Sequence, residues 1–273
     1  MTSPHRLTIT VLAALAFSLV RPITAAAGES NDRQVSFATS DKTLSGPLNG
    51  HIYEPVGTGP FPAVVLLHTC AGIHAFNADW AEWLAQHGYV ALVVDSFAGR
   101  QVTSVCNAGG DPNPRRRAMD AYDGLAYLRS LPEVDGKRVA VMGWSHGGSA
   151  AFVAAAKGFV DELSPPGGPF RAAIGLYPNC HPIKAVALSA PLLVLLGGQD
   201  VWQPAENCQE AVNRLAKNGI EATVQVFPSA GHGFDDSHAA QGKSHTVYST
   251  VYDADAAADT HQRVLAYLQE KMR

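Results

Sequence analysis

The sequence has little of what nucleic-acid-binding, disordered or membrane-spanning proteins need. Lys and Arg total 20 against 24 Asp and Glu, and the net charge of −4 leaves no general basic field for phosphates. Charged residues make up only 16% and hydrophobic residues 47%, which excludes a disordered chain. Past the first 27 residues, no apolar run approaches the roughly 18–20 residues that span a bilayer. We therefore expect a globular protein with no nucleic-acid partner and no membrane association once an N-terminal segment is removed.

The N-terminal segment has the order of a secretory signal peptide. A short positive start, Met1–Arg6, precedes a largely apolar run at Leu7–Val20, and Ala25 and Ala27 stand at positions −3 and −1 of a cut before Gly28. Residues 1–27 are thus predicted to be a signal peptide, which implies a periplasmic or secreted protein. An uncleaved anchor or a buried helix is the alternative, because Arg21 directly follows the apolar run.

Cysteines are few, and none belongs to a C-x-x-C pair, so zinc binding is not indicated. The histidines show no metal-ligand spacing either, and we expect no metal and no cofactor. An even cysteine count in an exported protein favours disulfides. The chain order of the expected strands favours the pairs Cys180–Cys208 and Cys70–Cys106, although four cysteines allow three connectivities.

Residues 28–273 alternate short apolar runs with helical patterns and contain no linker. The runs at 63–68 and 89–94 are continuously apolar, as in strands buried on both faces of a parallel sheet. An antiparallel meander is expected earlier, between 34 and 55. This β-α-β alternation predicts one α/β domain over 28–273, with a mostly parallel central sheet, helices on both faces and no separate lid domain.

A serine nucleophile is predicted where a strand meets a helix. The segment Gly143–Gly148 (GWSHGG) follows a strand and precedes a helix, which is the context that gives G-x-S-x-G its meaning as a nucleophile elbow. Such a turn needs glycines beside Ser145, because its backbone leaves no room for Cβ atoms. A glycine-rich turn with an incidental serine is the alternative.

A serine hydroxyl needs a base, and the base needs an orienting acid. Asp200 follows the expected strand at 191–196, and His232 follows the expected strand at 222–227. Their order after Ser145 is the order of this fold class. We therefore predict the triad Ser145, His232 and Asp200. The alternatives are that Asp200 is only a turn aspartate and that His232 is only a surface-loop histidine.

An oxyanion would need two backbone donors. The N–H of His146 is one candidate, and the N–H of Cys70 is the other, with Thr69 as its alternative. Trp144 and Trp202 are predicted to wall a substrate pocket, with core or rim positions equally open. The basic run Arg115–Arg117 suggests a solvated helix start, or else a contact for a substrate carboxylate.

With these motifs, the sequence resembles the dienelactone hydrolase family of α/β-hydrolases. The resemblance rests on five segments and covers most of residues 28–273: LLHTCAG at 66–72, GYVALVVDSF at 88–97, VAVMGWSHGG at 139–148, LLVLLGGQD at 192–200 and GHGFD at 231–235. It implies a lidless α/β-hydrolase fold and cofactor-free hydrolysis of esters or lactones. Well-known members have a cysteine where Ser145 stands and an arginine where Asp236 stands, so the resemblance supports carboxylesterase activity in general.

The sequence thus predicts an exported serine hydrolase that cleaves small-molecule carboxylic esters or lactones through an acyl-enzyme. A peptidase or a polyester hydrolase on the same fold is an alternative within enzymes. A non-catalytic binding protein on this fold is an alternative from another class. The oligomeric state stays open.

Overall fold

The computed structural model of the chain describes residues 31–107, 110–180, 187–239 and 251–273. The predicted signal peptide lies outside these residues. Within them, no helix carries an apolar stretch long enough to cross a membrane.

The described residues build one eight-stranded sheet with the order β1-β2-β4-β3-β5-β6-β7-β8. β1 and β2 pair antiparallel, β2 pairs antiparallel with β4, and every later pairing is parallel. This confirms the mostly parallel sheet and the antiparallel opening. The strands are β1 (Asn31–Phe37), β2 (Leu48–Glu54), β3 (Phe61–Leu67), β4 (Val90–Asp95), β5 (Val134–Trp144), β6 (Ala172–Leu176), β7 (Leu192–Gly197) and β8 (Ala222–Phe227).

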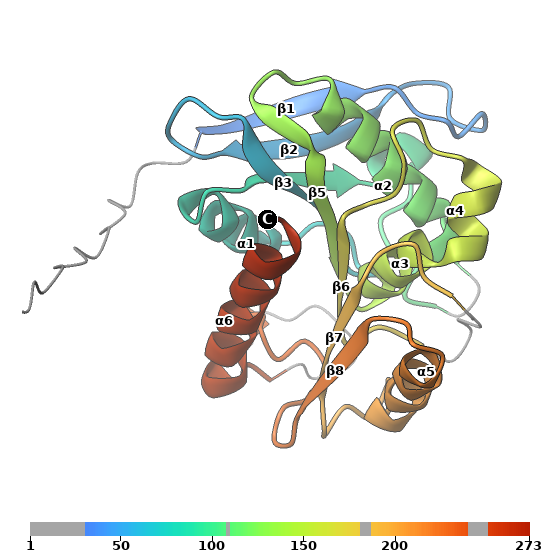
Figure 1. Cartoon of the computed structure of the whole chain (residues 1–273), viewed down its shortest axis with the longest axis vertical. Helices are drawn as coiled ribbons and strands as arrows, with labels where there is room; N and C mark the ends of the chain where they lie inside the picture. Colours follow the sequence, from blue (N-terminus) through green and yellow to red (C-terminus); the bar gives the residue numbers. More distant parts are fainter. Residues whose placement is uncertain (1–30, 108–109, 181–186, 240–250) are drawn as a thin grey trace, which may run out of the picture.

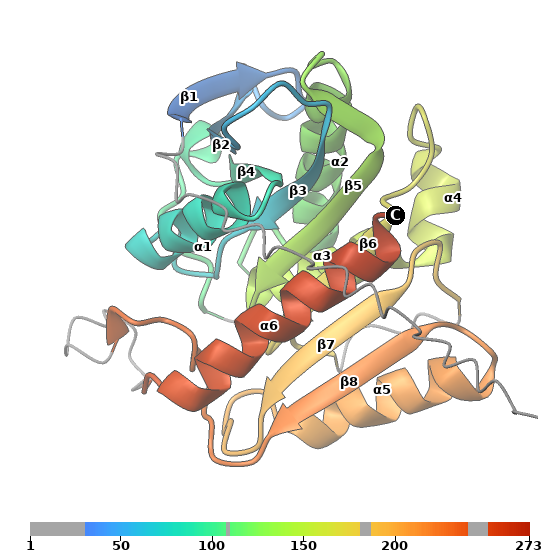
Figure 2. The ribbon, with the colours of Figure 1, turned by 60° about the vertical axis from the view of Figure 1, so that its left-hand side comes forward.

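Helices cover both faces of the sheet (Figures 1 and 2). One core lies between the sheet and α2, α3, α4 and α5, and the other lies between the sheet and the pair α1 and α6. The α/β-hydrolase fold class is confirmed. The helices are α1 (Ala75–Gln86), the 3₁₀ turn η1 (Ala98–Arg100), α2 (Pro114–Arg129), α3 (His146–Ala155), α4 (Lys157–Leu163), α5 (Ala205–Lys217) and α6 (Ala254–Lys271).

Local sequence explains why these elements form where they do. Every residue of β7 and every residue of β4 except Asp95 is buried, because helices pack on both sides of those strands. α2 begins with Asn113 as N-cap, whose side chain accepts from the Arg116 N–H, and with proline at its first position. The short helix α4 has no counterpart among the expected elements, since seven residues are too few for a clear helical period.

The order of strands locates the functional edge of the sheet. The chain crosses from β3 to β4 on one side and then back to β5 on the other side of β3. Loops that leave neighbouring parallel strands in opposite directions open a crevice beyond their carboxyl ends. The segments that follow β3 and β5 are those that carry Cys70 and Ser145.

Candidate active site

Ser145 occupies a strained turn between β5 and α3. Its backbone has φ 53° and ψ −114°, a positive-φ conformation that a non-glycine residue rarely adopts. The Ser145 N–H donates to the Leu176 carbonyl at 2.8 Å, and the Ser145 carbonyl accepts the Ser149 N–H at 2.9 Å. These hydrogen bonds stabilise the strained backbone conformation of Ser145 at the end of β5, as expected for a nucleophile elbow.

The glycines beside this turn are required by close approach. A Cβ on Gly143 would lie 2.3 Å from the Gly147 carbonyl oxygen, and a Cβ on Gly147 would lie 2.1 Å from the Leu67 carbonyl oxygen. No side chain fits at such distances. The elbow is therefore packed directly against the end of β3, and this contact brings the segment after β3 to the serine.

The structure brings Ser145, His232 and Asp200 together in a single hydrogen-bonded chain. His232 Nε2 lies 2.9 Å from Ser145 Oγ, and His232 Nδ1 lies 2.7 Å from Asp200 Oδ2. The three residues come from the carboxyl ends of β5, β8 and β7, as their order in the sequence predicted. This arrangement can move a proton from the serine hydroxyl to the imidazole.

Asp200 is held rigidly for this contact. Its side chain is only 1% exposed, and its Oδ1 accepts the backbone N–H groups of Trp202 and Gln203, both at 2.9 Å. Asp200 also accepts a hydrogen bond from the Nδ1–H of His232 at 2.7 Å. The proton stays on Nδ1, which leaves Nε2 as the acceptor facing Ser145.

The imidazole of His232 contacts two aromatic rings. Its centroid is 4.7 Å from that of Tyr177 and 4.6 Å from that of Trp202. Trp202 is half-buried beside the predicted base, and its role as a pocket wall stays a prediction. The two rings restrict rotation of the imidazole.

Trp144 does not wall a pocket, and that prediction is corrected. Its side chain is fully buried, and its indole N–H donates to Asp235 Oδ2 at 2.8 Å. Asp235 also accepts from Trp80 Nε1 at 3.0 Å and from the Tyr177 hydroxyl at 2.7 Å. Burial raises the pKa of Asp235, and the hydrogen bonds from Tyr177 and the indoles oppose that rise.

The sequence indicates no role for Asp235 beyond its place in the GHGFD segment, and this network was not predicted. A buried carboxylate with three donors cannot be recognised from one sequence, since its partners lie 58 to 155 residues away. Asp235 joins the His232 loop to α1, to β5 and to the end of β6. It therefore contributes to the placement of both Ser145 and His232.

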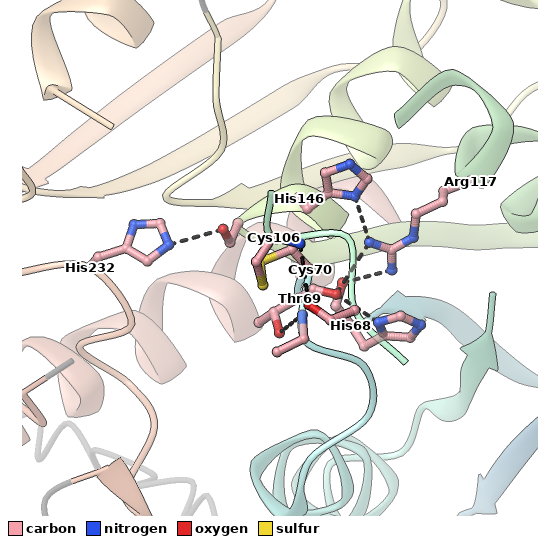
Figure 3. The surroundings of a disulfide bond; sticks show 10 residues. His68, Thr69, Cys70, Cys106, Arg117, His146 and His232 are labelled. Carbon is pink, nitrogen blue, oxygen red and sulfur yellow. Dashed lines mark hydrogen bonds between the residues drawn. A yellow bond between two sulfur atoms is a disulfide. The ribbon is translucent and has the colours of Figure 1, made fainter. Parts of the chain in front are cut away.

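The segment after β3 carries the predicted Cys70 donor and is fixed by a disulfide and several hydrogen bonds (Figure 3). Cys70 is bonded to Cys106, with the two Cα atoms 4.8 Å apart, and the Cys70 carbonyl accepts the Val105 N–H at 2.8 Å. His68 is fully buried, its Nδ1 lies 2.8 Å from the Thr69 carbonyl oxygen, and its Nε2 faces the Ser96 N–H at 3.4 Å. Burial and the nearby Arg117 charge hold the pKa of His68 well below its usual range, so it is a neutral structural group.

The basic run in the first turn of α2 is not as a whole the solvated helix start that was expected, because only Arg115 is exposed. Arg115 and Arg116 are paired with Glu162 and with Asp41 and Asp111. Arg117 is fully buried and contacts His68, Thr69 and His146. The three neighbouring arginines thus have separate partners. They do not form a cluster that could bind a substrate carboxylate.

The second disulfide lies on the other side of the elbow. Cys180 and Cys208 are both buried, with Cα atoms 5.0 Å apart, and join the segment after β6 to α5. Both pairs of the favoured connectivity are therefore present.

Comparison with known proteins decides the family. A family model described as the dienelactone hydrolase family matches residues 48–272. The chain belongs to the dienelactone hydrolase family. This membership makes it an enzyme that hydrolyses carboxylic esters or lactones.

Relatives in the dienelactone hydrolase family span the chain. It is 28% identical to a carboxymethylenebutenolidase of Pseudomonas putida over 242 residues, which cover 84% of this chain and 94% of the relative. Two solved structures share the fold. A dienelactone hydrolase-like promiscuous phosphotriesterase, P91, from metagenomic libraries has a TM-score of 0.70 at 24% identity and covers 90% of this chain and 100% of its own. A dienelactone hydrolase from Anabaena variabilis has a TM-score of 0.67 at 16% identity, with coverage of 90% and 100%.

The resemblance to well-known dienelactone hydrolases implies that Asp236 stands where those members carry an arginine. In this chain its carboxylate accepts the His238 N–H at 3.0 Å, within the same loop. An acceptor-only group cannot hold a substrate carboxylate. The position thus provides no cation for an acidic lactone.

Proposed function

We propose that this chain is an exported serine hydrolase that cleaves neutral carboxylic esters or lactones through an acyl-enzyme. The observation that carries the proposal is the continuous contact from Ser145 Oγ to His232 Nε2 and from His232 Nδ1 to Asp200. Asp236 in place of the family's arginine supports neutral substrates over acidic dienelactones.

The steps follow from this geometry. Ser145 Oγ attacks the carbonyl carbon while His232 takes the hydroxyl proton, and Asp200 stabilises the imidazolium. The carbonyl oxygen becomes an oxyanion that accepts from the N–H groups of His146 and Cys70. The intermediate expels the alcohol, which takes the proton from His232. Water activated by His232 then releases the acid and restores Ser145.

Export is supported by the predicted signal peptide and by the two disulfides, since such bonds persist in oxidising compartments. A cytosolic location would leave these four cysteines as thiols. Peptide mapping of the protein from its native host, without reduction, tests this part of the proposal.

Labelling with a fluorophosphonate tests the nucleophile. The wild-type protein should be modified at Ser145, and Ser145→Ala should abolish labelling and lower kcat on p-nitrophenyl acetate by about 10⁴-fold or more. Ser149→Ala is the matched control, because Ser149 lies one turn further along α3 and should leave labelling intact. An unlabelled wild-type protein would indicate a binding protein.

A substrate panel separates the enzyme alternatives. p-Nitrophenyl esters and neutral lactones should be turned over faster than a dienelactone carboxylate or a peptide amide. Hydrolysis of the peptide alone would place the chain among peptidases.

A further inference from the structure

Arg117 is a fully buried cation outside the triad. It stands in the first turn of α2, and none of its surface reaches solvent. Burial lowers the pKa of Arg117 to about 9, so the guanidinium stays protonated at neutral pH. Placing a charge in the protein interior is costly unless the charged group is hydrogen-bonded. The hydrogen-bond partners of Arg117 therefore indicate its role.

Among the described residues, every hydrogen-bond partner of the Arg117 side chain belongs to the two segments that carry the proposed oxyanion donors (Figure 3), and its Nε has no partner. Nη2 donates to the His68 carbonyl at 2.7 Å, and Nη1 reaches the Thr69 carbonyl at 3.4 Å. Nη1 also donates to His146 Nδ1 at 2.9 Å. Among the described residues, no carboxylate oxygen accepts from Arg117. Its acidic neighbour Asp120 is occupied by Arg100, at 2.8 Å to each oxygen.

The contacts with the His68 and Thr69 carbonyls help to orient the next N–H groups, together with His68 Nδ1, which lies 2.8 Å from the Thr69 carbonyl oxygen. A trans peptide is planar, and its N–H points away from its carbonyl. The His68 carbonyl shares a peptide with the Thr69 N–H, and the Thr69 carbonyl shares one with the Cys70 N–H. With Arg117 on the carbonyl side of both peptides, both N–H groups point away from the guanidinium. A charge-assisted bond to a carbonyl also polarises that amide and strengthens its N–H as a donor.

The contact with His146 secures the other donor. His146 is the first residue of α3, and the N–H groups of a first helical turn have no partner within the helix. Because Arg117 donates to Nδ1, the imidazole is neutral, and burial together with Arg117 lowers the pKa of His146 to about 3. One side chain thus contacts both walls of the predicted oxyanion hole.

We propose that Arg117 is a positioning residue that aligns and polarises the backbone donors of the oxyanion hole on both the Cys70 side and the His146 side. The inference rests on the proposed serine-hydrolase function. Arg117 acts through the Thr69–Cys70 peptide and the start of α3, and it has no role in proton transfer.

Arg129 provides a matched control on the same helix. It also donates to backbone carbonyls, those of Gly136, Pro166 and Gly168, at 2.7 to 3.0 Å. Those carbonyls belong to the start of β5 and to the loop before β6, at the opposite end of α2. A purely structural role for a half-buried guanidinium is therefore represented by Arg129, without a hydrogen bond to the active-site segments.

The experiment compares Arg117→Met, Arg117→Lys and Arg129→Met on p-nitrophenyl acetate. Loss of a preorganised oxyanion donor costs about 10²–10³-fold in kcat, and misalignment should cost less. We expect Arg117→Met to lower kcat by about 10–100-fold with KM nearly unchanged, and Arg117→Lys to fall between it and wild type. Arg129→Met should keep the wild-type kcat even where its Tm falls.

Inhibition by phenylboronic acid tests the oxyanion hole directly, because its Ki would not change if Arg117 had only a structural role. Phenylboronic acid adds to the serine as a tetrahedral anion and so occupies the oxyanion position. Its Ki should rise in Arg117→Met by the same factor as kcat/KM falls, whereas inhibition by the uncharged ground-state analogue acetanilide should not change.

Several outcomes would overturn the inference. One is a folded Arg117→Met that keeps the wild-type kcat and boronate Ki. Another is a loss of activity that follows Tm equally in the Arg117 and Arg129 variants. If Arg117→Met does not fold, Arg117→Lys decides by the same two criteria. Failure of the proposed function looks different, because the wild-type protein itself would then resist fluorophosphonate labelling.

Discussion

At His232, the proposed role as the base depends on which ring nitrogen carries the proton. Asp200 is buried and holds two backbone N–H groups in addition to the imidazole. The orientation of the Asp200 carboxylate is therefore set before any substrate arrives. The proton stays on Nδ1 of His232, where it faces Asp200. The proposed triad would need no rearrangement to begin the reaction, which is how preorganised groups lower a barrier.

The pH profile follows from the histidines around Ser145. His232 must be neutral to act as the base, so kcat/KM should rise with pH through one ionisation. His146, with a pKa of about 3, and His68, with its pKa well below the usual range, stay neutral through that ionisation. Rates measured from pH 5 to 9 on a chemistry-limited ester should therefore fit a single ionisation. A second ionisation near pH 6 that survives in His232→Ala would contradict the assignment.

Among the elements, the His232 loop depends on Asp235. This carboxylate accepts from Trp80 of α1, from Trp144 of β5 and from Tyr177 after β6. The loop after β8 is thereby connected to three elements that meet at the active-site edge of the sheet. Loops usually move more than the elements they join, and Asp235 counteracts that tendency next to the base.

Substitutions at Asp235 and Tyr177 should show how much the hydrogen bonds of this network contribute to stability. Asp235→Leu would leave two indole N–H groups and a hydroxyl buried without an acceptor, at about 1–3 kcal/mol for each group. We expect a large loss in the free energy of unfolding, or no folding. Tyr177→Phe removes one bond but keeps the ring against His232, and should cost about 1–2 kcal/mol. Urea denaturation checks both, and equal stability of Asp235→Leu and wild type would refute the role of the network.

The two disulfides should affect different properties, because they anchor different elements. Cys70–Cys106 ties down the segment with the proposed oxyanion donor, whereas Cys180–Cys208 joins the segment after β6 to α5. Replacing Cys70 and Cys106 by serine should lower kcat more than tenfold. Replacing Cys180 and Cys208 by alanine should lower stability by about 3–4 kcal/mol for a loop of 28 residues, with kcat retained. Thermal melts and ester assays on both double variants provide the comparison, and identical effects would reject this division.

Across the whole molecule, a buried ionic network joins the antiparallel opening of the sheet to the parallel part. Asp41, between β1 and β2, accepts from Arg100 and from Arg116, each at 2.7 Å. Arg100 also binds Asp120 of α2. Breaking a buried pair on one side is costly because the remaining charge has no counterion. The network therefore couples the opening strands to the helix that carries Arg117.

Acid stability should depend on Asp41. Burial alone would raise its pKa, but hydrogen bonds from Arg100, Thr43 and Arg116 lower the pKa below the ordinary value. The folded state then stays ionised where the unfolded chain takes up a proton, so this stabilisation is present above about pH 4 and is lost as the pH falls. Asp41→Asn should reduce stability at pH 7 by about 2–4 kcal/mol and flatten its loss toward pH 3.

Asp135→Asn is the control for that measurement. Asp135 forms a surface pair with Arg138, and its side chain is 29% exposed, so its loss should cost less than about 1 kcal/mol. Urea midpoints at pH 7 and pH 3 test both variants. An acid dependence in Asp41→Asn as steep as in wild type would assign the effect to other carboxylates.

Much of the fold and the candidate triad was predictable because the relevant signals are local. Continuous apolar runs identified the central strands, and glycines beside Ser145 identified the turn. Asp200 and His232 could be chosen because each follows a strand, and parallel strands end at one edge. The misassigned residues were those whose surroundings come from distant segments. Trp144 was placed at a pocket wall, and Arg117 was grouped with its solvated neighbours.

The sequence by itself determined the strand-and-helix order, the nucleophile turn and the chain order of the predicted triad, because backbone propensity and hydrophobic period act over a few residues. Only the tertiary structure decided which polar groups are buried and what they contact. Asp235 and Arg117 have no local pattern that distinguishes them from loop and surface residues. Their environment exists only after the sheet has closed around them, since desolvation and hydrogen bonding depend on groups brought together from the whole chain.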